Sequence, residues 1–283
     1  MKVGFVSIVG KPNVGKSTLI NRLIGTPISI VSNKPQTTRN RILGIWTNQE
    51  GQIIFIDTPG HFKPKNKLEE AMQSQIDKSI NDADLVMVLI DNREESRNID
   101  FSTIEDNKPI FLLINKIDLI KEEDLKKIEE SLETKRFTKI FPISALRGDN
   151  VEKIIPSLLE YLKEGEPFYP EDYISDRNER FFIEEFIRET IFEEYGQEIP
   201  YSVAVKVENM KDNKIDIKIF VERESQKGII IGKGGEKLKK VLSESRKKIE
   251  RFLGYQVYMN TWVEVKKNWR KNEKEVRKFG YYE

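Results

Sequence analysis

The chain has 283 residues, a length that suggests two domains, each able to bury a core of its own. It contains no cysteine, which excludes disulfides, zinc sites built on thiolates and a cysteine nucleophile. Its formal net charge is only +1, yet residues 1–199 hold 27 Lys and Arg against 35 Asp and Glu, whereas residues 200–283 hold 21 against 12. The basic C-terminal part indicates a module that binds a polyanion, although a solvated basic face without a partner is the plainer alternative.

No segment has the pattern of a membrane span or an export signal. The longest apolar runs, such as 85–90, are far too short to cross a bilayer. The N-terminus enters a strand-like run almost at once and has no signal-peptide pattern. We therefore expect a soluble protein.

Strand-like and helical stretches alternate through the first part of the chain. The most apolar runs lack polar–apolar alternation, as expected of parallel strands that are buried on both faces. This pattern predicts a doubly wound α/β domain over residues 1–165, followed by a proline- and acid-rich linker over 166–180. The strand-like runs are 3–9, 41–47, 52–56, 85–90, 110–114 and 139–143, and the helical stretches lie near 16–24, 68–80, 121–133 and 150–163.

A glycine-rich loop follows the first predicted strand and opens the first predicted helix. Residues 10–17 fit G-x-x-x-x-G-K-[ST], the P-loop pattern in which backbone N–H groups converge on phosphate oxygens. We expect Lys16 to reach the β- and γ-phosphates and the Ser17 hydroxyl to bind Mg²⁺. A glycine-rich turn that fits the pattern by chance is a weak alternative. The predicted phosphate-binding residues are Gly10, Lys11, Pro12, Asn13, Val14, Gly15, Lys16, Ser17 and Thr18.

Two further elements are placed to complete a site for Mg²⁺ and the γ-phosphate. The run 52–56 ends in Asp57-Thr58-Pro59-Gly60, in which we expect Asp57 to hold Mg²⁺ through water. The Gly60 N–H can bond a γ-phosphate only while that phosphate exists, so this loop loses an anchor on hydrolysis. The D-T-P-G sequence is also typical of a β-turn. Between the P-loop and this motif, the polar segment 34–40 carries two threonines, and we expect Thr38 rather than Thr37 to bind Mg²⁺.

A third motif predicts which base is bound. Asn115-Lys116-Ile117-Asp118 directly follows the apolar run 110–114, at the strand end where open α/β sheets place ligands. The Asp118 carboxylate can accept both the N1–H and the N2–H₂ donors of guanine, whereas adenine presents an acceptor there. The motif therefore predicts a guanine nucleotide. We also expect the backbone of Ser144-Ala145-Leu146, which follows the run 139–143, to touch the base.

Two residues near the predicted phosphate site each have two alternative roles. His61 is the only histidine and follows Gly60, where many small GTPases hold a glutamine that orients the attacking water. It is either a group that positions this water or a solvent-exposed residue of a switch loop. Asn13, within the P-loop, either resembles the asparagine with which potassium-activated GTPases help to hold a K⁺ ion between the phosphates or is an ordinary loop residue.

The C-terminal part is predicted to form a second, α+β domain over residues 181–283. Apolar residues at 182, 183, 186, 187 and 191 have helical spacing and indicate a helix that packs into a core. Residues 201–208 and 214–222 alternate with period two and flank the polar stretch 209–213, which predicts an antiparallel hairpin. A third strand is expected at 257–265, and Trp269 in the basic tail is expected to pack rather than to stack on a base.

A G-x-x-G loop lies between two predicted helices of this second domain. Gly232-Lys233-Gly234-Gly235 fits the loop of a KH domain, which clamps the backbone of about four single-stranded nucleotides. The order of strands and helices around it is that of the prokaryotic, type II KH domain. The predicted RNA-binding residues are Ile231, Gly232, Lys233, Gly234, Gly235, Lys237 and Lys240.

The five guanine-nucleotide elements occur in the order and spacing of the translation-factor-type GTPases. With the Q-T-T-R sequence at 36–39 and the C-terminal domain, the chain resembles the bacterial Era GTPases over essentially its whole length. The resemblance implies a GTPase that uses GTP, GDP and Mg²⁺ and binds the 3′ end of small-subunit (16S) rRNA during assembly of the small ribosomal subunit. It also implies a cytoplasmic protein that associates loosely with the inner face of the cell membrane, although no anchor is visible. We expect a monomer.

Three functional hypotheses remain to be compared. The favoured one is a slow GTPase switch whose nucleotide state controls RNA binding, with Lys16, Thr38, Gly60 and His61 as the candidate catalytic residues. An RNA-binding scaffold with a vestigial nucleotide pocket is disfavoured because the P-loop and Asp118 are intact. A metabolic or transport ATPase with an accessory domain is disfavoured by the N-K-x-D motif.

Overall fold

The computed structural model describes residues 1–32, 34–60, 64–93, 97, 104–105, 107–132 and 136–282. The chain forms two compact units. The first unit comprises residues 1–29, 38–63 and 72–176, and the second comprises 30–37, 64–71 and 177–283. His61 lies outside the described residues.

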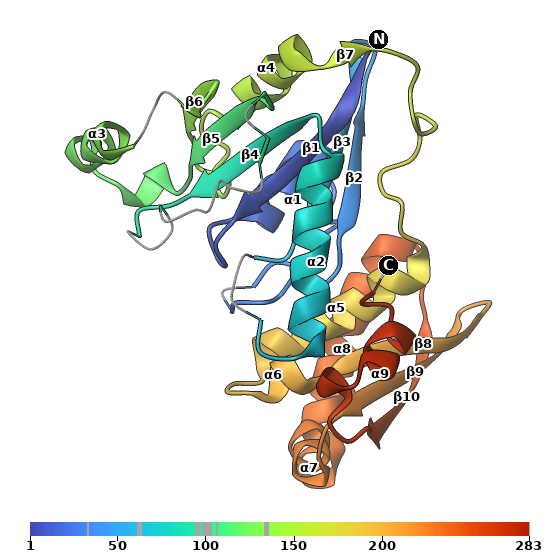
Figure 1. Ribbon diagram of the computed structural model, residues 1–283. Helices are drawn as coiled ribbons and strands as arrows, with labels where there is room; N and C mark the ends of the chain where they lie inside the picture. Colours follow the sequence, from blue (N-terminus) through green and yellow to red (C-terminus); the bar gives the residue numbers. More distant parts are fainter. Residues whose placement is uncertain are drawn as a thin grey trace. The chain divides into compact units, whose positions relative to one another are not determined.

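A mixed sheet forms the centre of the first unit (Figure 1). Its strands run in the order β2-β3-β1-β4-β5-β6, and β7 pairs with β1. Strands β3, β1, β4, β5 and β6 are parallel to one another, whereas β2 pairs with β3 and β7 pairs with β1 in antiparallel fashion. The strands are β1 (Lys2–Gly10), β2 (Ile42–Thr47), β3 (Gly51–Asp57), β4 (Leu85–Ile90), β5 (Ile110–Ile114), β6 (Lys139–Pro142) and β7 (Lys163–Glu164).

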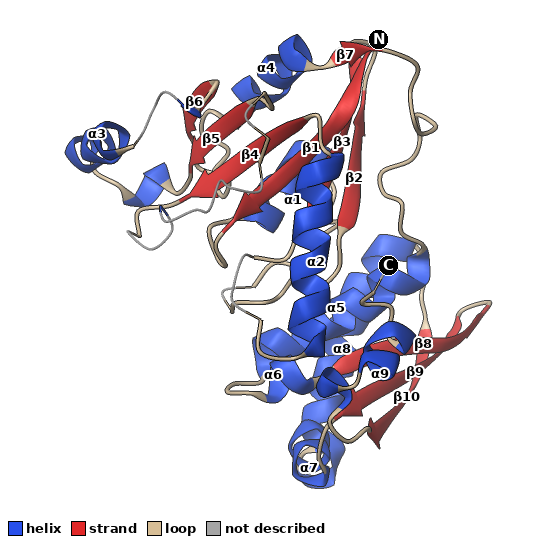
Figure 2. Cartoon of the chain, in the orientation of Figure 1, coloured by secondary structure: helices blue, strands red, loops and turns tan. Residues whose placement is uncertain are grey.

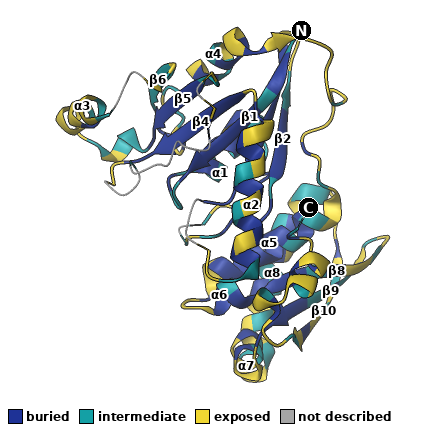
Figure 3. Cartoon of the chain, viewed as in Figure 1, coloured by how far each residue is buried: buried dark blue, intermediate teal, exposed yellow. Residues whose placement is uncertain are grey.

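Helices cover both faces of this sheet, as the predicted doubly wound fold requires. The even-numbered residues of β4 pack into an apolar cluster with side chains of α2 and α3, and every residue of β4 is buried (Figure 3). On the other face, the ring of Phe111 in β5 meets that of Tyr161 in α4 at 5.4 Å. The α-helices of this part of the chain are α1 (Lys16–Ile24), α2 (Lys67–Asp82), α3 (Glu122–Ser131) and α4 (Ile154–Tyr161), and short 3₁₀ turns cover Ile117–Leu119 and Val151–Lys153.

The parallel strands bring the predicted motifs to one edge of the sheet (Figure 2). The P-loop follows β1, D-T-P-G follows β3, N-K-x-D follows β5 and S-A-L follows β6. Because the carboxyl ends of parallel strands share one edge, motifs that lie more than 100 residues apart in sequence become neighbours.

Part of the predicted linker is held against the first unit by hydrogen bonds. The Gln52 side chain of β3 donates to the Tyr169 carbonyl at 2.8 Å and accepts from the Phe168 N–H at 2.7 Å. The Ile45 N–H of β2 donates to the Ile174 carbonyl at 3.0 Å, and Ser175 forms an isolated bridge with Gly44. Residues 168–176 therefore lie alongside β2 and β3.

The second unit contains a three-stranded sheet in the order β10-β9-β8, in which β10 is parallel and β8 antiparallel to β9. Helices α5 and α8 pack together, and the apolar stripe predicted on α5 is buried. The order of these elements is that of the predicted type II KH domain. Its elements are α5 (Glu179–Glu194), α6 (Ile199–Ser202), β8 (Ala204–Lys211), β9 (Lys214–Val221), α7 (Glu224–Ile231), α8 (Glu236–Leu253), β10 (Tyr258–Val265) and α9 (Glu273–Lys278), with 3₁₀ turns at Lys233–Gly235 and Trp269–Lys271.

The hairpin of the second unit is shifted from its predicted position. Residues 199–202 form α6, so β8 begins at Ala204 rather than at residue 201. Strand β8 then continues to Lys211, because a register shift between Val207 and Asn209 absorbs one residue and breaks the alternation on which the prediction rested. The turn is consequently shorter than the predicted 209–213.

Trp269 packs in the core, as predicted. Its side chain is fully buried, its indole N–H donates to the Ser202 carbonyl at 2.8 Å, and its ring meets those of Phe279 and Tyr281. Among the described residues, no helix is both long and apolar enough to cross a membrane.

Candidate functional site

The P-loop joins β1 to α1 in a conformation that depends on glycine at two positions. A Cβ at Gly10 would lie 2.5 Å from the Leu89 carbonyl oxygen, so a side chain would collide with β4. Gly15 has φ +103°, a left-handed value that L-residues rarely adopt, and a Cβ there would meet the Asn115 amide. The two glycines thus let the loop pack closely against β4 and the Asn115 side chain.

The Lys16 side chain is buried beneath this loop. Its ammonium donates to the carbonyls of Gly10 at 3.0 Å and Lys11 at 3.2 Å. Burial lowers the pKa of Lys16 to about 8, and the negative charge of Asp57 opposes the shift. Phosphate oxygens would stabilise the charged ammonium much better than the two carbonyls do.

A group of oxygen ligands stands beside the P-loop helix. The Ser17 hydroxyl lies 3.0 Å from the Thr38 hydroxyl and donates to Asp57 Oδ2 at 3.0 Å. Ser29, which the sequence analysis did not identify, also donates to Asp57 Oδ2, at 2.5 Å. Thr37 points its hydroxyl elsewhere and donates to the Lys34 carbonyl at 2.7 Å.

This group fits the predicted Mg²⁺ ion. Asp57 is fully buried, and its Oδ1 atom has no hydrogen-bond partner in the described part of the chain. Burial raises the pKa of the Asp57 carboxyl, and the hydrogen bond from Ser29 and the charge of Lys16 oppose the shift. A buried carboxylate oxygen without a partner, next to two hydroxyls, is a set of hard oxygen ligands of the kind that Mg²⁺ prefers.

The D-T-P-G motif contacts β1 and the P-loop. Thr58 is buried and donates from its hydroxyl to the Ile8 carbonyl of β1 at 2.8 Å. A Cβ at Gly60 would lie 2.9 Å from the Cα of Pro12, so this backbone approaches the P-loop as closely as glycine permits. The structure therefore places the Gly60 backbone beside the phosphate loop.

The N-K-x-D and S-A-L motifs lie together at the other end of the site. The Ser144 hydroxyl donates to Asp118 Oδ1 at 2.6 Å, and this orients the carboxylate that was predicted to bind guanine. The Ile117 N–H donates to the Ile143 carbonyl at 3.2 Å. Leu146 is 73% exposed, which places its side chain outside the site.

Asn115 links the two ends of the site. Its amide nitrogen donates to the Val14 carbonyl of the P-loop at 2.7 Å, and its amide oxygen accepts from the Ala145 N–H at 2.8 Å. The side chain is buried and both ends of its amide bond protein backbone. Asn115 therefore positions the two loops, and its role in nucleotide binding stays a prediction.

Asp91 was missed by the sequence analysis. It directly follows β4 and is fully buried, and its Oδ2 accepts from the Lys116 ammonium at 2.8 Å and from the Arg93 guanidinium at 2.9 Å. Lys116 also donates to the Asn13 carbonyl at 2.7 Å. Burial alone would raise the pKa of Asp91, but the hydrogen bonds from Lys116 and the Arg93 N–H hold it below its usual value.

Arg22 on α1 is a second residue that the sequence analysis missed. Its guanidinium donates to the carbonyls of Ala145 at 2.6 Å and Leu146 at 2.5 Å, and so fixes the S-A-L loop. The only available signal for Asp91 was its place directly after an apolar run. Arg22 and Ser29 gave no signal, since an arginine in a helix and a serine in a loop are common.

The G-x-x-G loop of the second unit connects α7 to α8. Gly232, Gly234 and Gly235 have φ values of +75°, +61° and +82°, which explains glycine at these positions. A Cβ at Gly234 or Gly235 would meet nothing within 4 Å, so the backbone at the tip of the loop is open. Lys233 and Lys237 are exposed.

Two of the predicted RNA-binding lysines contact the end of α5 or Tyr195, the residue that follows this helix. Lys240 forms an ion pair with Glu194 at 2.6 Å, and the Lys237 ammonium lies 5.9 Å from the centre of the Tyr195 ring. The Tyr195 hydroxyl donates to the Ile230 carbonyl at 2.7 Å, and burial, with the nearby charge of Glu194, raises the pKa of this phenol to about 12. Tyr195 thus connects the end of α5 to the helix that leads into the G-x-x-G loop.

Comparison with known families assigns each part of the chain. Residues 5–116 match a family described as a 50S ribosome-binding GTPase, and residues 198–270 match the KH domain family. The first match contains the P-loop and the D-T-P-G motif and ends within N-K-x-D, and the second contains the G-x-x-G loop.

Two solved structures resemble the whole chain. One is an Aquifex aeolicus Era variant bound to GDP·AlF₄⁻, with 41% identity, a TM-score of 0.95 and full coverage of both chains. The other is an Era in complex with MgGDPNP and nucleotides 1506–1542 of 16S ribosomal RNA, with 42% identity, a TM-score of 0.95 and full coverage of both chains.

Proposed function

This chain belongs to the Era family of GTPases, and we propose that it is a GTP-hydrolysing switch that binds the 3′ end of 16S rRNA through its KH domain during assembly of the small ribosomal subunit. One observation carries the nucleotide part of this proposal. A single sheet edge holds a P-loop, a buried set of Mg²⁺ ligands and an oriented carboxylate that can bind guanine.

We assign the following roles within the nucleotide site. Backbone N–H groups of the P-loop and the Lys16 ammonium bind the β- and γ-phosphates. Mg²⁺, bound by the hydroxyls of Ser17 and Thr38 and through water by Asp57, would supply positive charge to the same phosphates. The Gly60 N–H bonds the γ-phosphate until hydrolysis releases it as inorganic phosphate. Water is positioned by His61 or by backbone groups, and the alternative roles of Asn13 stay open.

The base assignment is tested by Asp118→Asn. Guanine offers two donors to the carboxylate, whereas xanthine carries a carbonyl where guanine has its amino group, to which an asparagine amide can donate. We expect GTP affinity to fall at least about 10²-fold, because hydrogen bonds to a buried charged group are lost, and xanthosine triphosphate to become the preferred ligand. Competition titrations with GTP, ATP and xanthosine triphosphate, with phosphate release followed in parallel, measure this.

Asp149→Asn is the matched control for this titration, since it removes an exposed carboxylate from the neighbouring loop. It should leave the order of affinities unchanged. Unaltered GTP selectivity in Asp118→Asn would refute the base assignment, and equal affinity of the unmutated protein for ATP would refute the proposed GTPase.

The RNA part of the proposal rests on the second unit. Residues 200–283 carry nine more positive than negative charges, and the open G-x-x-G backbone lies among exposed lysines. The similar Era that was solved with 16S rRNA covers the whole of this chain, and this supports the same RNA class as the ligand here. We place its work in the cytoplasm, with a loose association with the inner face of the cell membrane that rests on family resemblance alone.

We also propose that nucleotide state and RNA binding are coupled through residues 30–37, which belong to the second unit. The Val31 N–H donates to Glu189 Oε1 at 3.0 Å, and the Lys34 ammonium donates to the carbonyls of Phe192 and Tyr195 at the end of α5. Thr38, the predicted Mg²⁺ ligand, is the next residue along the chain. Tyr195 in turn bonds the helix that precedes the G-x-x-G loop.

Lys34→Ala is expected to weaken this coupling. In the unmutated protein, RNA affinity should differ between the complex with a non-hydrolysable GTP analogue and the complex with GDP. Without Lys34, the ratio of these two affinities should move toward one, because the segment next to Thr38 loses its bonds to the carbonyls of Phe192 and Tyr195 and retains the bond from the Val31 N–H to Glu189. Lys65→Ala, which removes the same charge from the other segment, 64–71, should keep the ratio. If the ratio of RNA affinities in the two nucleotide states is the same in Lys34→Ala as in the unmutated protein, coupling through residues 30–37 is excluded.

A further inference from the structure

One face of the sheet in the second unit carries aromatic side chains in solvent. Alternate residues of β10 point away from the core, and among them Tyr258 is 63% and Trp262 is 50% exposed. Both belong to the edge strand of the sheet. Soluble proteins rarely hold two large aromatic rings in water on one strand unless the rings contact something.

Each of these rings stands beside a lysine of the neighbouring strand. In the parallel register of β10 and β9, Tyr258 pairs with Lys214 and Trp262 pairs with Lys218. Between them, the Asn260 amide donates to Asp216 at 2.9 Å. We call Tyr258, Trp262, Lys214 and Lys218 the β10 aromatic face.

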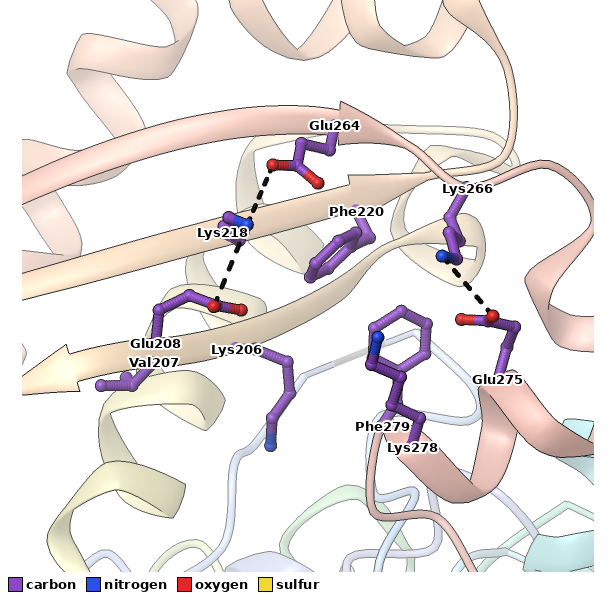
Figure 4. A pocket seen from close by; sticks show the side chains of 10 residues that line it. All are labelled: Lys206, Val207, Glu208, Lys218, Phe220, Glu264, Lys266, Glu275, Lys278 and Phe279. Carbon is purple, nitrogen blue, oxygen red and sulfur yellow. Dashed lines mark ion pairs between the residues drawn. The ribbon is translucent and has the colours of Figure 1, made fainter.

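The charges on and around this face are largely compensated. Lys218 lies 3.1 Å from Glu264 and 3.9 Å from Glu208, Lys266 lies 3.5 Å from Glu275, and Lys206 bonds Glu184. These ion pairs surround a hollow of about 340 Å³ at the end of the face, which Phe220 and Phe279 close with ring centres 4.9 Å apart (Figure 4). A phosphate in this hollow would have to compete with three carboxylates, so we assign no phosphate site to it.

The strand that carries the β10 aromatic face packs against the helix that leads into the G-x-x-G loop. Strand β10 contacts α7, and α7 ends at Ile231, directly before Gly232 (Figure 1). The edge strand of the sheet is therefore a neighbour of the helix from which the loop extends, and RNA that continues beyond the loop can pass over this edge. The loop itself accommodates only about four nucleotides.

We propose that the β10 aromatic face is a second contact for the same single-stranded RNA, in which Tyr258 and Trp262 stack on unpaired bases beyond those held by the G-x-x-G loop. The inference rests on the proposed RNA binding and extends it. Stacking needs only an exposed ring and tolerates any base, and a neighbouring lysine adds a cation where the strand passes. Aromatic residues on an open sheet face stack two or three bases in another class of RNA-binding domain.

The decisive experiment compares RNA length between variants of the full chain. A four-nucleotide RNA fills only the G-x-x-G loop, and a twelve-nucleotide RNA that contains the same four nucleotides extends beyond it. Trp262→Ala and Tyr258→Ala should each weaken binding of the long RNA between about fivefold and a hundredfold and leave the short RNA unaffected. Trp262→Phe keeps a ring and should retain most of the affinity.

Tyr173→Ala is the matched control, since Tyr173 is 49% exposed and belongs to the first unit. It should bind both RNAs as the unmutated protein does. The melting temperature of each variant should be unchanged, because half-exposed rings contribute little to the core.

Fluorescence of the unmutated protein gives a second measurement that needs no folding control. Stacking of a base on Trp262 should quench tryptophan emission with the long RNA but not with the short one, and Trp262→Phe should abolish this change. The affinity gained from the longer RNA should also depend only weakly on salt, because base stacking is not ionic and, of the two lysines on the face, Lys218 is already paired with Glu264 and Glu208.

Two outcomes would overturn the inference. The long RNA binds Trp262→Ala as tightly as the unmutated protein, or both RNAs lose affinity equally. If the short RNA fails to bind the unmutated protein, the proposed function itself fails. If the short RNA binds and the extension adds nothing, only the β10 aromatic face is refuted.

Discussion

Replacing Lys16 with alanine should abolish GTP hydrolysis, with a loss of at least about 10³-fold, while the fold persists. Lys16 is the buried cation that points into the P-loop, where charge on the phosphates must be stabilised in the transition state. Without nucleotide, the melting temperature should stay close to that of the unmutated protein. The reason is that burial already disfavours the charged ammonium, as its lowered pKa indicates, and this offsets the two lost hydrogen bonds to carbonyls.

Two measurements check this expectation. Phosphate release under saturating GTP gives the rate, and thermal melting with and without GDP gives the stabilisation by ligand, which should largely disappear in Lys16→Ala. Lys78→Ala, which removes an exposed lysine of α2 outside the nucleotide site, serves as the control and should retain both activity and stabilisation. Surviving hydrolysis in Lys16→Ala would contradict the assignment of the phosphate site.

The second large effect is expected at the G-x-x-G loop. Changing Lys233 and Gly234 to aspartate alters the charge of the loop tip by three units and places carboxylates where RNA phosphates would approach. RNA binding should become undetectable, with a loss of more than about 10²-fold, and GTP hydrolysis without RNA should be unchanged. A Cβ at position 234 meets nothing within 4 Å, and aspartate tolerates the left-handed backbone there better than most residues, so the loop should keep its course.

The matched control makes the same change of charge on a different part of the same unit. Ser243→Asp with Lys247→Asp alters α8 by three units away from the loop and should reduce RNA affinity far less. Binding is best measured as a function of salt, because loss of one phosphate contact in Lys233→Ala should reduce the slope of log affinity against log salt by about one. If the loop variant and the α8 variant lose the same affinity, RNA binding reflects net charge and not this loop.

Much of the architecture could be predicted from the sequence because its signals are local. Continuous apolar runs identified the strands buried on both faces, and the order of strand, motif and helix was enough to place four loops at one edge of the sheet. The same holds for the apolar stripe of α5 and for the packing of Trp269. In each case, one stretch of chain contains the whole pattern.

What the sequence did not reveal depends on contacts between distant segments. Asp91 pairs with Lys116, and Arg22 donates to the carbonyls of Ala145 and Leu146. Neither contact produces a periodic pattern or a fixed motif spacing in the sequence that could be recognised. The start of β8 was misplaced because α6 and a register shift interrupt the alternation there. The sequence of residues 30–37 has no apolar periodicity, so nothing in it indicated that these residues belong with the second unit.

The buried amide of Asn115 has a consequence for how GDP and GTP are distinguished. Because one side chain bonds both the Val14 carbonyl and the Ala145 N–H, the distance between the loop that holds the phosphates and the loop beside the base is fixed. Di- and triphosphates must then share the same alignment from guanine to the β-phosphate, and this rigid part contributes equally to both affinities. Any difference between them arises only beyond the β-phosphate, at Lys16, Thr38 and Gly60. A variant that weakens the Asn115 bridge should therefore reduce the affinity for both nucleotides alike and leave their ratio unchanged.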